Sequence, residues 1–276
     1  MLEIPESKVT SGQLDSILKG KIITQVLVNN SPHKFAFYNG DPNEYASILM
    51  GKIITGANAA AGQIELHAED SILLFSDGVN LRYYEPNVAP PEKHQLFLEF
   101  NDNSHLIVTI QMYGGIWAFI EGQNDNFYYL VTKQKPSPLS EEFDEKYFLS
   151  LFDSVKQTIS VKAFLATEQR IPGLGNGVLQ DILFDACIHP ATRLQYLSIN
   201  DKKKMFTSVK NKLIEMTEKG GRDTEKDLLG NWGGYQTNLS SRTFGSLCMI
   251  CGGSIIRRAF LGGNVYFCPI CQVEKK

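Results

Sequence analysis

The stretch Cys248-Met-Ile-Cys251, followed by Phe267-Cys268-Pro-Ile-Cys271, gives the end of the chain the spacing Cys248-X2-Cys251-X16-Cys268-X2-Cys271. Each Cys-x-x-Cys pair can place two thiolates on one side of a tight turn, and two such turns bring four sulfurs to the corners of a tetrahedron. The spacing therefore predicts one Zn²⁺ ion held by Cys248, Cys251, Cys268 and Cys271. Four thiolates close the coordination shell, so the predicted role of the ion is structural.

The residues between the two pairs predict a β-hairpin. Ile255–Phe260 and Val265–Phe267 are rich in branched and aromatic residues, and Leu261-Gly-Gly-Asn264 lies between them as the tip. Arg257 and Arg258 lie on the first strand and are candidates for contact with DNA. The spacing alone allows two other interpretations, a module that only anchors the end of the chain or one that binds protein.

A glycine-rich segment, Gln169-Arg-Ile-Pro-Gly-Leu-Gly-Asn-Gly177, joins two helical patterns upstream. The three glycines permit left-handed backbone angles and close approach by another molecule. The start of a helix favours an anion such as a phosphate, and the candidate contacts are Gln169, Gly173, Gly175 and Asn176. It is not a dinucleotide-binding fingerprint, because Val178 stands where the third glycine would be and no strand precedes it. The alternative is a tight turn between helices without a ligand.

The rest of the chain predicts an α+β fold. An amphipathic helix over 7–19 leads into short strands separated by turn residues, which is typical of a β-sandwich. The expected strands include Ile22–Val28, Ile64–His67, Ser71–Phe75, Leu96–Phe100 and His105–Ile110. Helices are expected over 141–152, 162–168, 178–186 and 201–219. The predicted parts are an N-terminal β-sandwich domain over 1–125, a linker over 126–140, a helical domain over 141–238 and a zinc finger over 239–276.

Composition limits the class of protein. The chain has 276 residues and a formal net charge of −3, so any surface for nucleic acid must be local. It has neither an apolar run long enough to cross a membrane nor a signal-peptide pattern at its start. We expect a cytoplasmic protein, associated with the nucleoid in a bacterium. Such a compartment keeps cysteines reduced, which favours a metal over disulfides. The fifth cysteine, Cys187, lies in an apolar helical stretch and is expected in the core.

Together the two motifs resemble the formamidopyrimidine-DNA glycosylase/endonuclease VIII family. The residues that match the family's helix–two-turns–helix element are Gln169, Gly173, Gly175, Asn176, Asp181, Leu183, Phe184 and Ile188-His189-Pro190. The residues that match the end of its zinc finger are Phe267, Cys268, Cys271 and Gln272. Gly-Gly at 220–221, Gly-Gly-Tyr-Gln at 233–236 and the start Leu2-Glu3-Ile4-Pro5-Glu6 also resemble family segments, so the likeness covers the whole chain.

The resemblance implies an activity on damaged DNA. The family removes oxidised bases and then nicks the abasic strand, using the secondary amine of an N-terminal proline and the glutamate that follows it. Attack on the sugar C1′ gives a Schiff base, after the base has been flipped out of the duplex. The implied partner is double-stranded DNA, damaged or abasic, bound by a monomer. The implied catalytic candidates are Glu3, Glu6 and the amine of Met1.

The sequence departs from the family pattern mainly at the positions that carry the family's catalytic residues. Leu2 stands in place of the proline, and a large second residue disfavours removal of Met1. Glu3 and Glu6 match the pattern, although capping of the following helix and charge at its first turn would also explain them. Ala61 stands in place of the family's lysine, and Gly263 in place of the arginine at the finger tip. The residues that fill the void left by the flipped base fall near Asp77, Tyr113 and Gly114.

These observations leave three hypotheses. The first is an atypical DNA glycosylase/lyase that uses Met1's amine or a water activated by a glutamate. The second is a non-catalytic relative that binds damaged, bent or branched DNA. The third is a zinc-stabilised module that binds protein and has no role on DNA.

Overall fold

The computed structural model describes residues 2–276, which fold into two compact units. The first unit contains the chain up to Lys133 together with Lys219–Gly234, and the second contains Gln134–Glu218 together with Tyr235–Lys276. The return of 219–234 to the first unit differs from the division drawn from the sequence, which placed this segment in the helical domain. The candidate Met1 lies outside the described residues.

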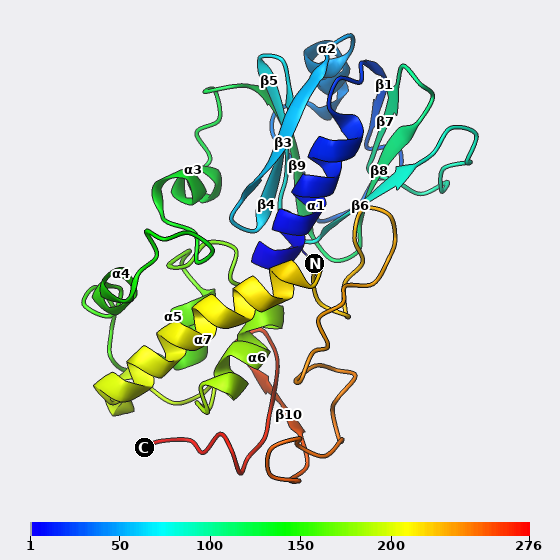
Figure 1. The fold of residues 1–276 in the computed structure, drawn as a ribbon. Helices are drawn as coiled ribbons and strands as arrows, with labels where there is room; N and C mark the ends of the chain where they lie inside the picture. The colour runs from blue at the N-terminus through cyan, green and yellow to red at the C-terminus, as the bar shows by residue number, and fades with distance from the viewer. Residues whose placement is uncertain (1) are drawn as a thin grey trace. The chain divides into compact units, whose positions relative to one another are not determined.

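The first unit is a β-sandwich with a leading helix, α1 (Ile4–Leu18), as the sequence predicts (Figure 1). One sheet has the order β2 (Ala36–Tyr38), β9 (Gly114–Ile120), β5 (Ser71–Phe75), β4 (Gln63–Ala68), β3 (Ile54–Ala60). The other has the order β1 (Ile23–Val28), β7 (Leu96–Phe100), β8 (His105–Ile110), β6 (Val79–Tyr84). The pair β2–β9 is parallel and the other pairs are antiparallel. A 3-10 turn over Pro42–Glu44 and the short helix α2 (Tyr45–Leu49) follow β2.

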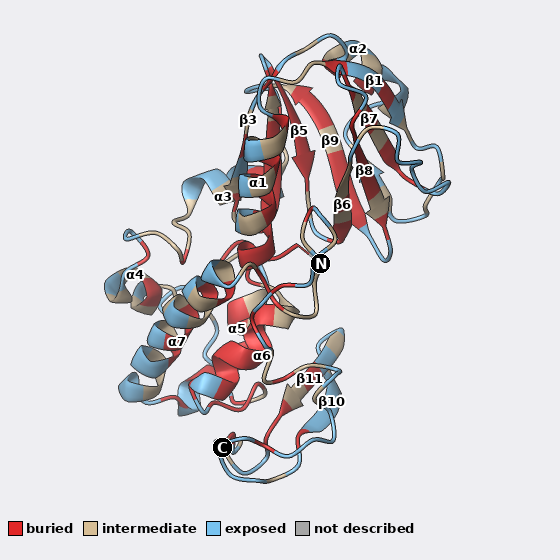
Figure 2. Ribbon diagram, turned by 45° about the vertical axis from the view of Figure 1, so that its right-hand side comes forward, coloured by how far each residue is buried: buried red, intermediate tan, exposed pale blue. Residues whose placement is uncertain are grey.

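A large hydrophobic core fills this unit between the sheets, and Figure 2 shows buried residues gathered there. A smaller cluster is formed by Ile72, Leu74, Phe119 and Tyr129. Leu14 and Leu18 of α1 join it, and so does Leu2, which is 5% exposed. Alternation of buried and partly exposed positions in β7 matches the expected period of two. Four strands were not predicted, β2, β3, β6 and β9. The first is only three residues long, while β3 and the start of β9 contain glycine, alanine and asparagine, which carry a weak strand signal.

Residues 219–234 are held on the first unit by hydrogen bonds to α1 and β6. The Gln13 amide donates to Asp227 Oδ2 at 2.9 Å and accepts from the Leu228 N–H at 3.0 Å. Arg82 Nη1 donates to the Asp227 carbonyl at 2.7 Å, and the Tyr83 N–H donates to the Leu228 carbonyl at 3.0 Å. The fully buried Leu228 side chain belongs to the sandwich core. These contacts explain why a segment late in the sequence folds with the first unit.

The predicted linker contains a helix, α3 (Phe127–Gln134), that docks on the first unit. Tyr129 donates a hydrogen bond of 2.6 Å to the buried Glu65 of β4, and Lys133 forms an ion pair with the same carboxylate. Burial alone would raise the pKa of Glu65, but the bonds from His67, Lys133 and Tyr129 outweigh it and lower the pKa to about 2. The polar composition of this segment therefore does not make it a flexible connection.

The second unit is helical and ends in the cysteine hairpin. Its elements are α4 (Glu145–Ser150), α5 (Val161–Ala166), α6 (Asn176–Asp185), a 3-10 turn (Leu194–Tyr196), α7 (Ile199–Glu218), β10 (Ile256–Phe260) and β11 (Gly263–Phe267). A cluster of aromatic rings from Phe143, Phe148, Phe152, Phe164 and Phe206 packs α4, α5 and α7 together. The expected helix over 141–152 is shorter than predicted, because Asp144 caps it by accepting the Tyr147 N–H at 2.6 Å.

Cys187 is exposed, so its predicted place in the core is wrong. Helix α6 ends at Asp185, and Cys187 follows with a left-handed φ of 55°. The residue that leaves a helix in this conformation no longer lies on the buried face of that helix. Among residues 2–276, no helix combines the length and the apolar character that a membrane crossing needs.

The hairpin is docked on α6 by one buried amide. Gln180, which is 5% exposed, donates through Nε2 to the Asn264 carbonyl at 3.1 Å and accepts the Tyr266 N–H through Oε1 at 3.0 Å. The Asn264 carbonyl also receives Asn176 Nδ2 at 3.0 Å. Gln180 is therefore the partner that fixes the Tyr266 N–H.

Replacement of Gln180 by methionine should loosen this docking without changing the size of the side chain. The buried Tyr266 N–H would lose its acceptor, at a cost of about 1–3 kcal/mol. We expect its amide hydrogen exchange to accelerate by about tenfold or more, since 1.4 kcal/mol corresponds to a factor of ten. Gln123→Met, at an exposed turn, is the matched control. Unchanged exchange at Tyr266 in Gln180→Met would contradict this role.

Candidate metal centre and nucleic-acid interface

The structure brings the four cysteines of the two pairs together. Their Sγ atoms all lie within 4.8 Å of one another, with 3.8 Å between Cys248 and Cys271 and 3.4 Å between Cys251 and Cys268. Four sulfurs about 2.3 Å from a central ion are separated by distances of this size in a tetrahedron. The cluster can therefore hold a metal ion, as the spacing predicts.

The backbone around the cluster is fixed by hydrogen bonds of its own. The Cys248 N–H donates to the Gly253 carbonyl at 2.7 Å, and the Cys271 N–H points to Cys268 Sγ at 3.5 Å. Gln272, which is buried, accepts the Cys268 N–H at 3.1 Å and donates to the Ile188 carbonyl at 3.0 Å. Such bonds orient thiolates before the ion binds. They also anchor the cysteine module to the end of α6.

The hairpin between the pairs differs from the prediction at its tip. Leu261 and Gly262 have φ values of 49° and 73°, so they form a two-residue turn of the kind that closes hairpins. Gly263 and Asn264 consequently belong to β11 and not to the tip. A Cβ on Gly263 would lie 3.6 Å from both Asn176 Nδ2 and Lys162 Nζ. The strand after the turn thus lies against the glycine-rich segment.

Within the glycine-rich segment, fewer glycines adopt left-handed backbone angles than the sequence suggests. Gly173 is left-handed with a φ of 76°, whereas Gly175 is the extended N-cap of α6 and Gly177 lies inside that helix. Gln169 is also left-handed, and its carbonyl accepts a hydrogen bond from Lys135 Nζ at 2.6 Å. Only the first of the three glycines therefore needs glycine for its backbone angles.

The glycine-rich segment and the hairpin form one surface in the second unit. Asn176 donates to the Asn264 carbonyl, and Lys162 Nζ donates to the Phe260 carbonyl at 2.6 Å, so both side chains are used to hold the hairpin. Burial lowers the pKa of Lys162. Asn176 Oδ1 is buried without a hydrogen-bond partner among the described residues. The amide of Asn176, a predicted phosphate donor, thus already donates one hydrogen bond within the protein.

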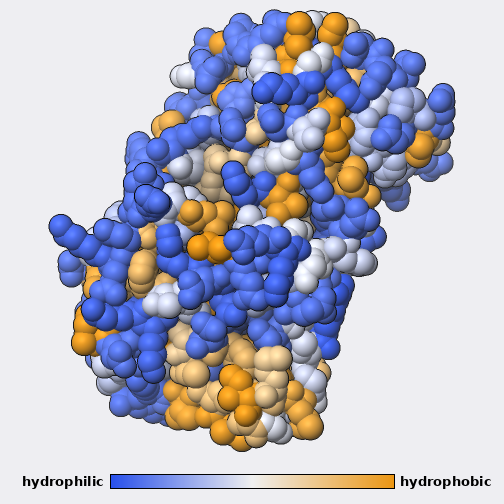
Figure 3. All heavy atoms as spheres, viewed as in Figure 1, coloured by the Kyte–Doolittle hydropathy of each residue, from blue (hydrophilic) through white to orange (hydrophobic). Residues whose placement is uncertain are grey.

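The exposed cations of this surface are Arg257 and Arg258 on β10. Both side chains are exposed, and their guanidinium groups lie 5.1 Å from the ring centre of Phe244 and 5.8 Å from that of Phe260, respectively. The module also exposes large apolar side chains, which contribute to the hydrophobic area in Figure 3. These include Leu247, Met249, Ile250 and Ile270.

The two glutamates singled out at the start of the chain are buried in the first unit and share one arginine. Arg222 Nε and Nη2 donate to the two carboxylate oxygens of Glu6 at 2.8 and 2.9 Å, and its backbone N–H donates to Glu6 Oε1 at 3.2 Å. Arg222 Nη1 lies 3.5 Å from Glu3 Oε2. Glu3, Glu6 and Arg222 are 3%, 6% and 2% exposed. Glu3 is the N-cap residue of α1, but its side chain makes no capping hydrogen bond, so the capping interpretation is wrong for Glu3.

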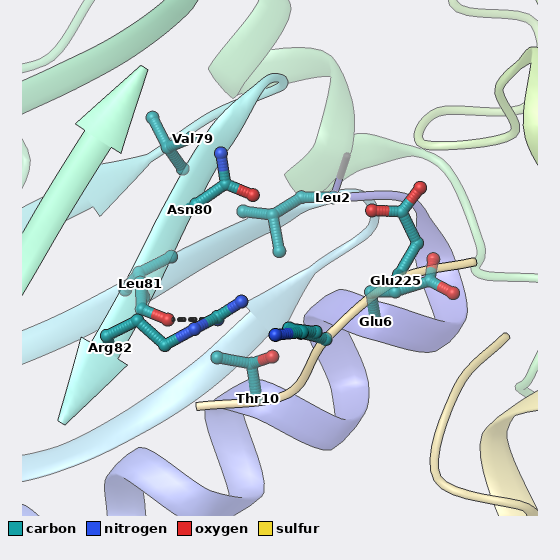
Figure 4. Close-up of a pocket in the computed structure, with 9 residues that line it drawn as sticks. Leu2, Glu6, Thr10, Val79, Asn80, Leu81, Arg82 and Glu225 are labelled. Carbon is teal, nitrogen blue, oxygen red and sulfur yellow. Dashed lines mark hydrogen bonds between the residues drawn. The ribbon is translucent and has the colours of Figure 1, made fainter. Parts of the chain in front are cut away.

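Leu2 lies beside a small polar pocket in this unit. Figure 4 shows Leu2 and Glu6 together with Arg82 of β6 and Glu225 around the pocket. Its volume is about 10 Å³, close to the space that one water molecule needs and far too small for a nucleobase. The residue in the place of the family's proline is therefore a core residue next to a water-sized cavity.

Of the positions carried over to the β domain, Asp77 and Tyr113 are exposed, Ala61 is partly exposed, and Gly114 is buried at the start of β9. Asp77 and Gly78 form the turn between β5 and β6, and a Cβ on Gly78 would clash with the Tyr113 carbonyl at 1.7 Å, so two turns are packed backbone to backbone. Tyr113 and its neighbour Met112 are exposed. Crowding by protein atoms, together with Glu3, raises the pKa of Asp77 to about 6, although its surface remains open to solvent. Ala61, with a φ of 55°, lies in the β3–β4 hairpin turn and accepts a hydrogen bond from Ser7.

Sequence reasoning missed Arg222. The only signal was its place directly after Gly220-Gly221, two glycines that the structure shows with φ values of 76° and 96°. A basic residue after such a turn carries no pattern that points to a glutamate 216 positions earlier.

Comparisons with known proteins support this architecture. No family model matches the chain. A protein of Legionella pneumophila named formamidopyrimidine-DNA glycosylase is 26% identical over 279 residues, covering 99% of this chain and 98% of its own length. A protein of the same name from Streptococcus pneumoniae is 26% identical and covers 99% of both chains.

Solved structures give the same fold. A Lactococcus lactis Fpg in complex with DNA containing an abasic site aligns with a TM-score of 0.84 at 22% identity, over 99% of this chain and 100% of its own. The Fpg protein of Thermus thermophilus aligns with a TM-score of 0.82 over the same shares, also at 22% identity. Over its full length the chain is thus similar in sequence and fold to formamidopyrimidine-DNA glycosylases, and the four clustered cysteines at its end agree with that likeness.

Proposed function

We propose that this protein is a DNA glycosylase of base-excision repair that binds damaged double-stranded DNA. The observation that carries the proposal is the union of the glycine-rich segment with the cysteine hairpin in one surface, through Asn176, Gln180 and the Asn264 carbonyl. The relatives that match the whole chain are named for this activity, and the Lactococcus lactis neighbour was solved with DNA containing an abasic site. Action as a monomer in the cytoplasm stays a prediction.

Binding to DNA is proposed to depend on charge at the phosphate backbone. The overall net charge of −3 opposes association with DNA, so the attraction must come from local cations. Arg257 and Arg258 are exposed on β10 and suit this role. The left-handed turn at Gly173 allows a phosphate to approach the main chain of the glycine-rich segment. Contacts of this kind hold the duplex without reading its sequence.

For base excision, we propose that Glu3 accepts a proton from water. The water oxygen forms the new bond to C1′, the bond from C1′ to the base breaks with its electron pair leaving on the base, and the water proton passes to the Glu3 carboxylate. Leu2 stands where the family has the nucleophilic proline, so this chain has no secondary amine at that position. The lyase step, which needs a Schiff base, is therefore proposed to be weak.

We propose that the ion held by the four cysteines is zinc, in a structural role. Thiolate ligands in a closed tetrahedral set suit Zn²⁺, and a closed set leaves no position for water. The ion would fix the two turns from which β10 and β11 extend.

Removal of the metal should disorder the hairpin. We expect about one zinc ion per chain on elemental analysis, and loss of amide protection in β10 and β11 after treatment with a strong chelator, because the binding energy of such a site is also its folding energy. Cys268→Ala should do the same, while Cys187→Ala, which changes a cysteine outside the cluster, should keep both metal and protection. A protein with no bound metal and a fully protected hairpin would contradict the zinc proposal.

The affinity for DNA should fall steeply with salt. We expect the logarithm of the association constant for a duplex with an abasic-site analogue to decrease linearly with the logarithm of the salt concentration. Replacement of Arg257 and Arg258 by alanine should reduce the slope by about 2, one for each lost phosphate contact. Arg193→Ala, at another exposed arginine, is the control. No binding, or an affinity that does not change between low and moderate salt, would exclude the DNA proposal.

Borohydride should trap little or no covalent adduct on abasic DNA, because the site lacks the proline amine. A family member with an N-terminal proline is the positive control under the same conditions. Excision of a damaged base, followed by release of the free base, should still be measurable by chromatography. A strong adduct mapped to Met1 would show that a primary amine acts as the nucleophile and would overturn the water route.

A further inference from the structure

We propose that Arg222 is a positioning residue that keeps Glu3 ionised and fixed in orientation. The inference rests on the proposed function, because it assigns Glu3 the part of a proton acceptor. It names a residue of this chain, in the segment after α7, whose side chain acts only through another side chain.

The guanidinium of Arg222 is fixed on one side by Glu6. Two parallel N–H donors, Nε and Nη2, bind the two oxygens of that carboxylate at 2.8 and 2.9 Å. A bidentate pair of this kind sets the plane of the guanidinium as well as its position. The remaining nitrogen, Nη1, is left facing Glu3 Oε2 at 3.5 Å. Glu6 therefore orients Arg222, and Arg222 presents a charge to Glu3.

The backbone that carries Arg222 is equally constrained. Gly233 lies so close that a Cβ on it would be 2.3 Å from the Gly221 carbonyl carbon and 2.5 Å from the Arg222 carbonyl oxygen. The Gly234 N–H donates to the Lys219 carbonyl at 2.9 Å, which closes the segment on itself. The contact at Gly233 requires glycine, and it packs against the backbone of Gly221 and Arg222. The arginine cannot withdraw from the glutamates without opening this segment.

The burial of Glu3 makes a cation beside it favourable. A buried carboxylate tends to take up a proton, because burial disfavours the charged form. Acidic groups lie near this site, namely Glu6 on the same helix, Glu225 near Arg222, and Asp77, which senses the charge of Glu3. The pKa of Tyr113 is raised by burial and also by Glu3. The cations Arg82 and Lys226 line the neighbouring pocket with Glu6 and Glu225, whereas Arg222 is the cation in contact with Glu3 itself. Burial alone would lower the pKa of Arg222, but the charges of Glu3, Glu6 and Glu225 outweigh it and raise the pKa above its usual value. Arg222 thus stays protonated and opposes protonation of Glu3.

The consequence for the reaction is a carboxylate ready to accept a proton at neutral pH and below. Without Arg222, the same buried carboxylate would lose the cation in contact with it and would take a proton at a higher pH. It would then be unable to act as a base in the acidic part of the pH range. A merely structural arginine would affect stability without moving this titration.

The direct test is to follow the titration of the Glu3 carboxyl carbon by ¹³C NMR in the full chain. We expect its midpoint in Arg222→Met to be higher than in the wild type by about one pH unit or more. Because loss of one partner from a buried pair can prevent folding, the double variant Glu6→Met/Arg222→Met removes the pair as a unit and keeps the packing. Arg222→Lys retains the charge and should keep most of the wild-type titration, and Arg193→Met is the matched control. Equal midpoints in the wild type and both methionine variants would overturn the proposal.

The pH profile of base excision separates this inference from the proposed function. In the methionine variants we expect the acid limb of kcat to move to higher pH by the same amount as the Glu3 titration, with KM for damaged DNA changed little. If the wild type excises no base while the NMR midpoint moves, the proposed function fails and the positioning role stands. If the wild type excises bases and neither the midpoint nor the acid limb moves, the positioning role fails and the proposed function stands.

Discussion

The buried pair between Arg222 and Glu6 joins parts of the chain that are 216 positions apart. A guanidinium and a carboxylate removed from water lose hydration energy, and only a well-formed pair with further hydrogen bonds offsets that loss. Both conditions hold here, since the pair is bidentate and the Arg222 N–H also donates to Glu6. The pair is therefore stable only if residues 219–234 return to the first unit after α7. The packing of Leu228 in the sandwich core depends on the same return.

The features that could be predicted from the sequence are those with a local pattern. The cysteine spacing predicted a four-sulfur cluster, and branched or aromatic runs predicted β5, β7 and β8 with their observed bounds. Features that depend on contacts distant in sequence could not be predicted. The polar composition of 126–140 gave no sign that Tyr129 and Lys133 would dock α3 on Glu65. The apolar stretch around Cys187 hid the end of α6 at Asp185, because the change of backbone direction, and not composition, exposes that thiol.

The candidate site also combines features with a local sequence pattern and features that depend on distant contacts. The glycine-rich segment and the hairpin could each be recognised from the sequence. The sequence could not reveal that Asn176 and Lys162 donate hydrogen bonds to carbonyl groups of the hairpin. In this fold the carbonyl groups of the hairpin accept hydrogen bonds from side chains near the glycine-rich segment. Some of the donors that the sequence offers to a phosphate are therefore used within the protein. What remains for a ligand is the backbone near Gly173 and the exposed cations of β10. These internal hydrogen bonds make the connection between the two motifs rigid. A preorganised surface loses less entropy when it binds a ligand.

The leucine at the second residue, where the family has a proline, has a physical consequence. The Leu2 side chain has no nucleophilic group, is 5% exposed and belongs to the sandwich core. The pocket beside it has room for about one water molecule and is lined by charged groups, among them Glu6, Arg82 and Glu225. A leucine at this position thus exchanges a reactive group for packing energy of about 1.5–3 kcal/mol. The carboxylates next to it remain, and Arg222 contacts both of them. Under the proposed function these acids would handle protons, whereas the family's nucleophilic proline is replaced by Leu2. Under that proposal, hydrolysis is favoured over elimination, because elimination needs a Schiff base.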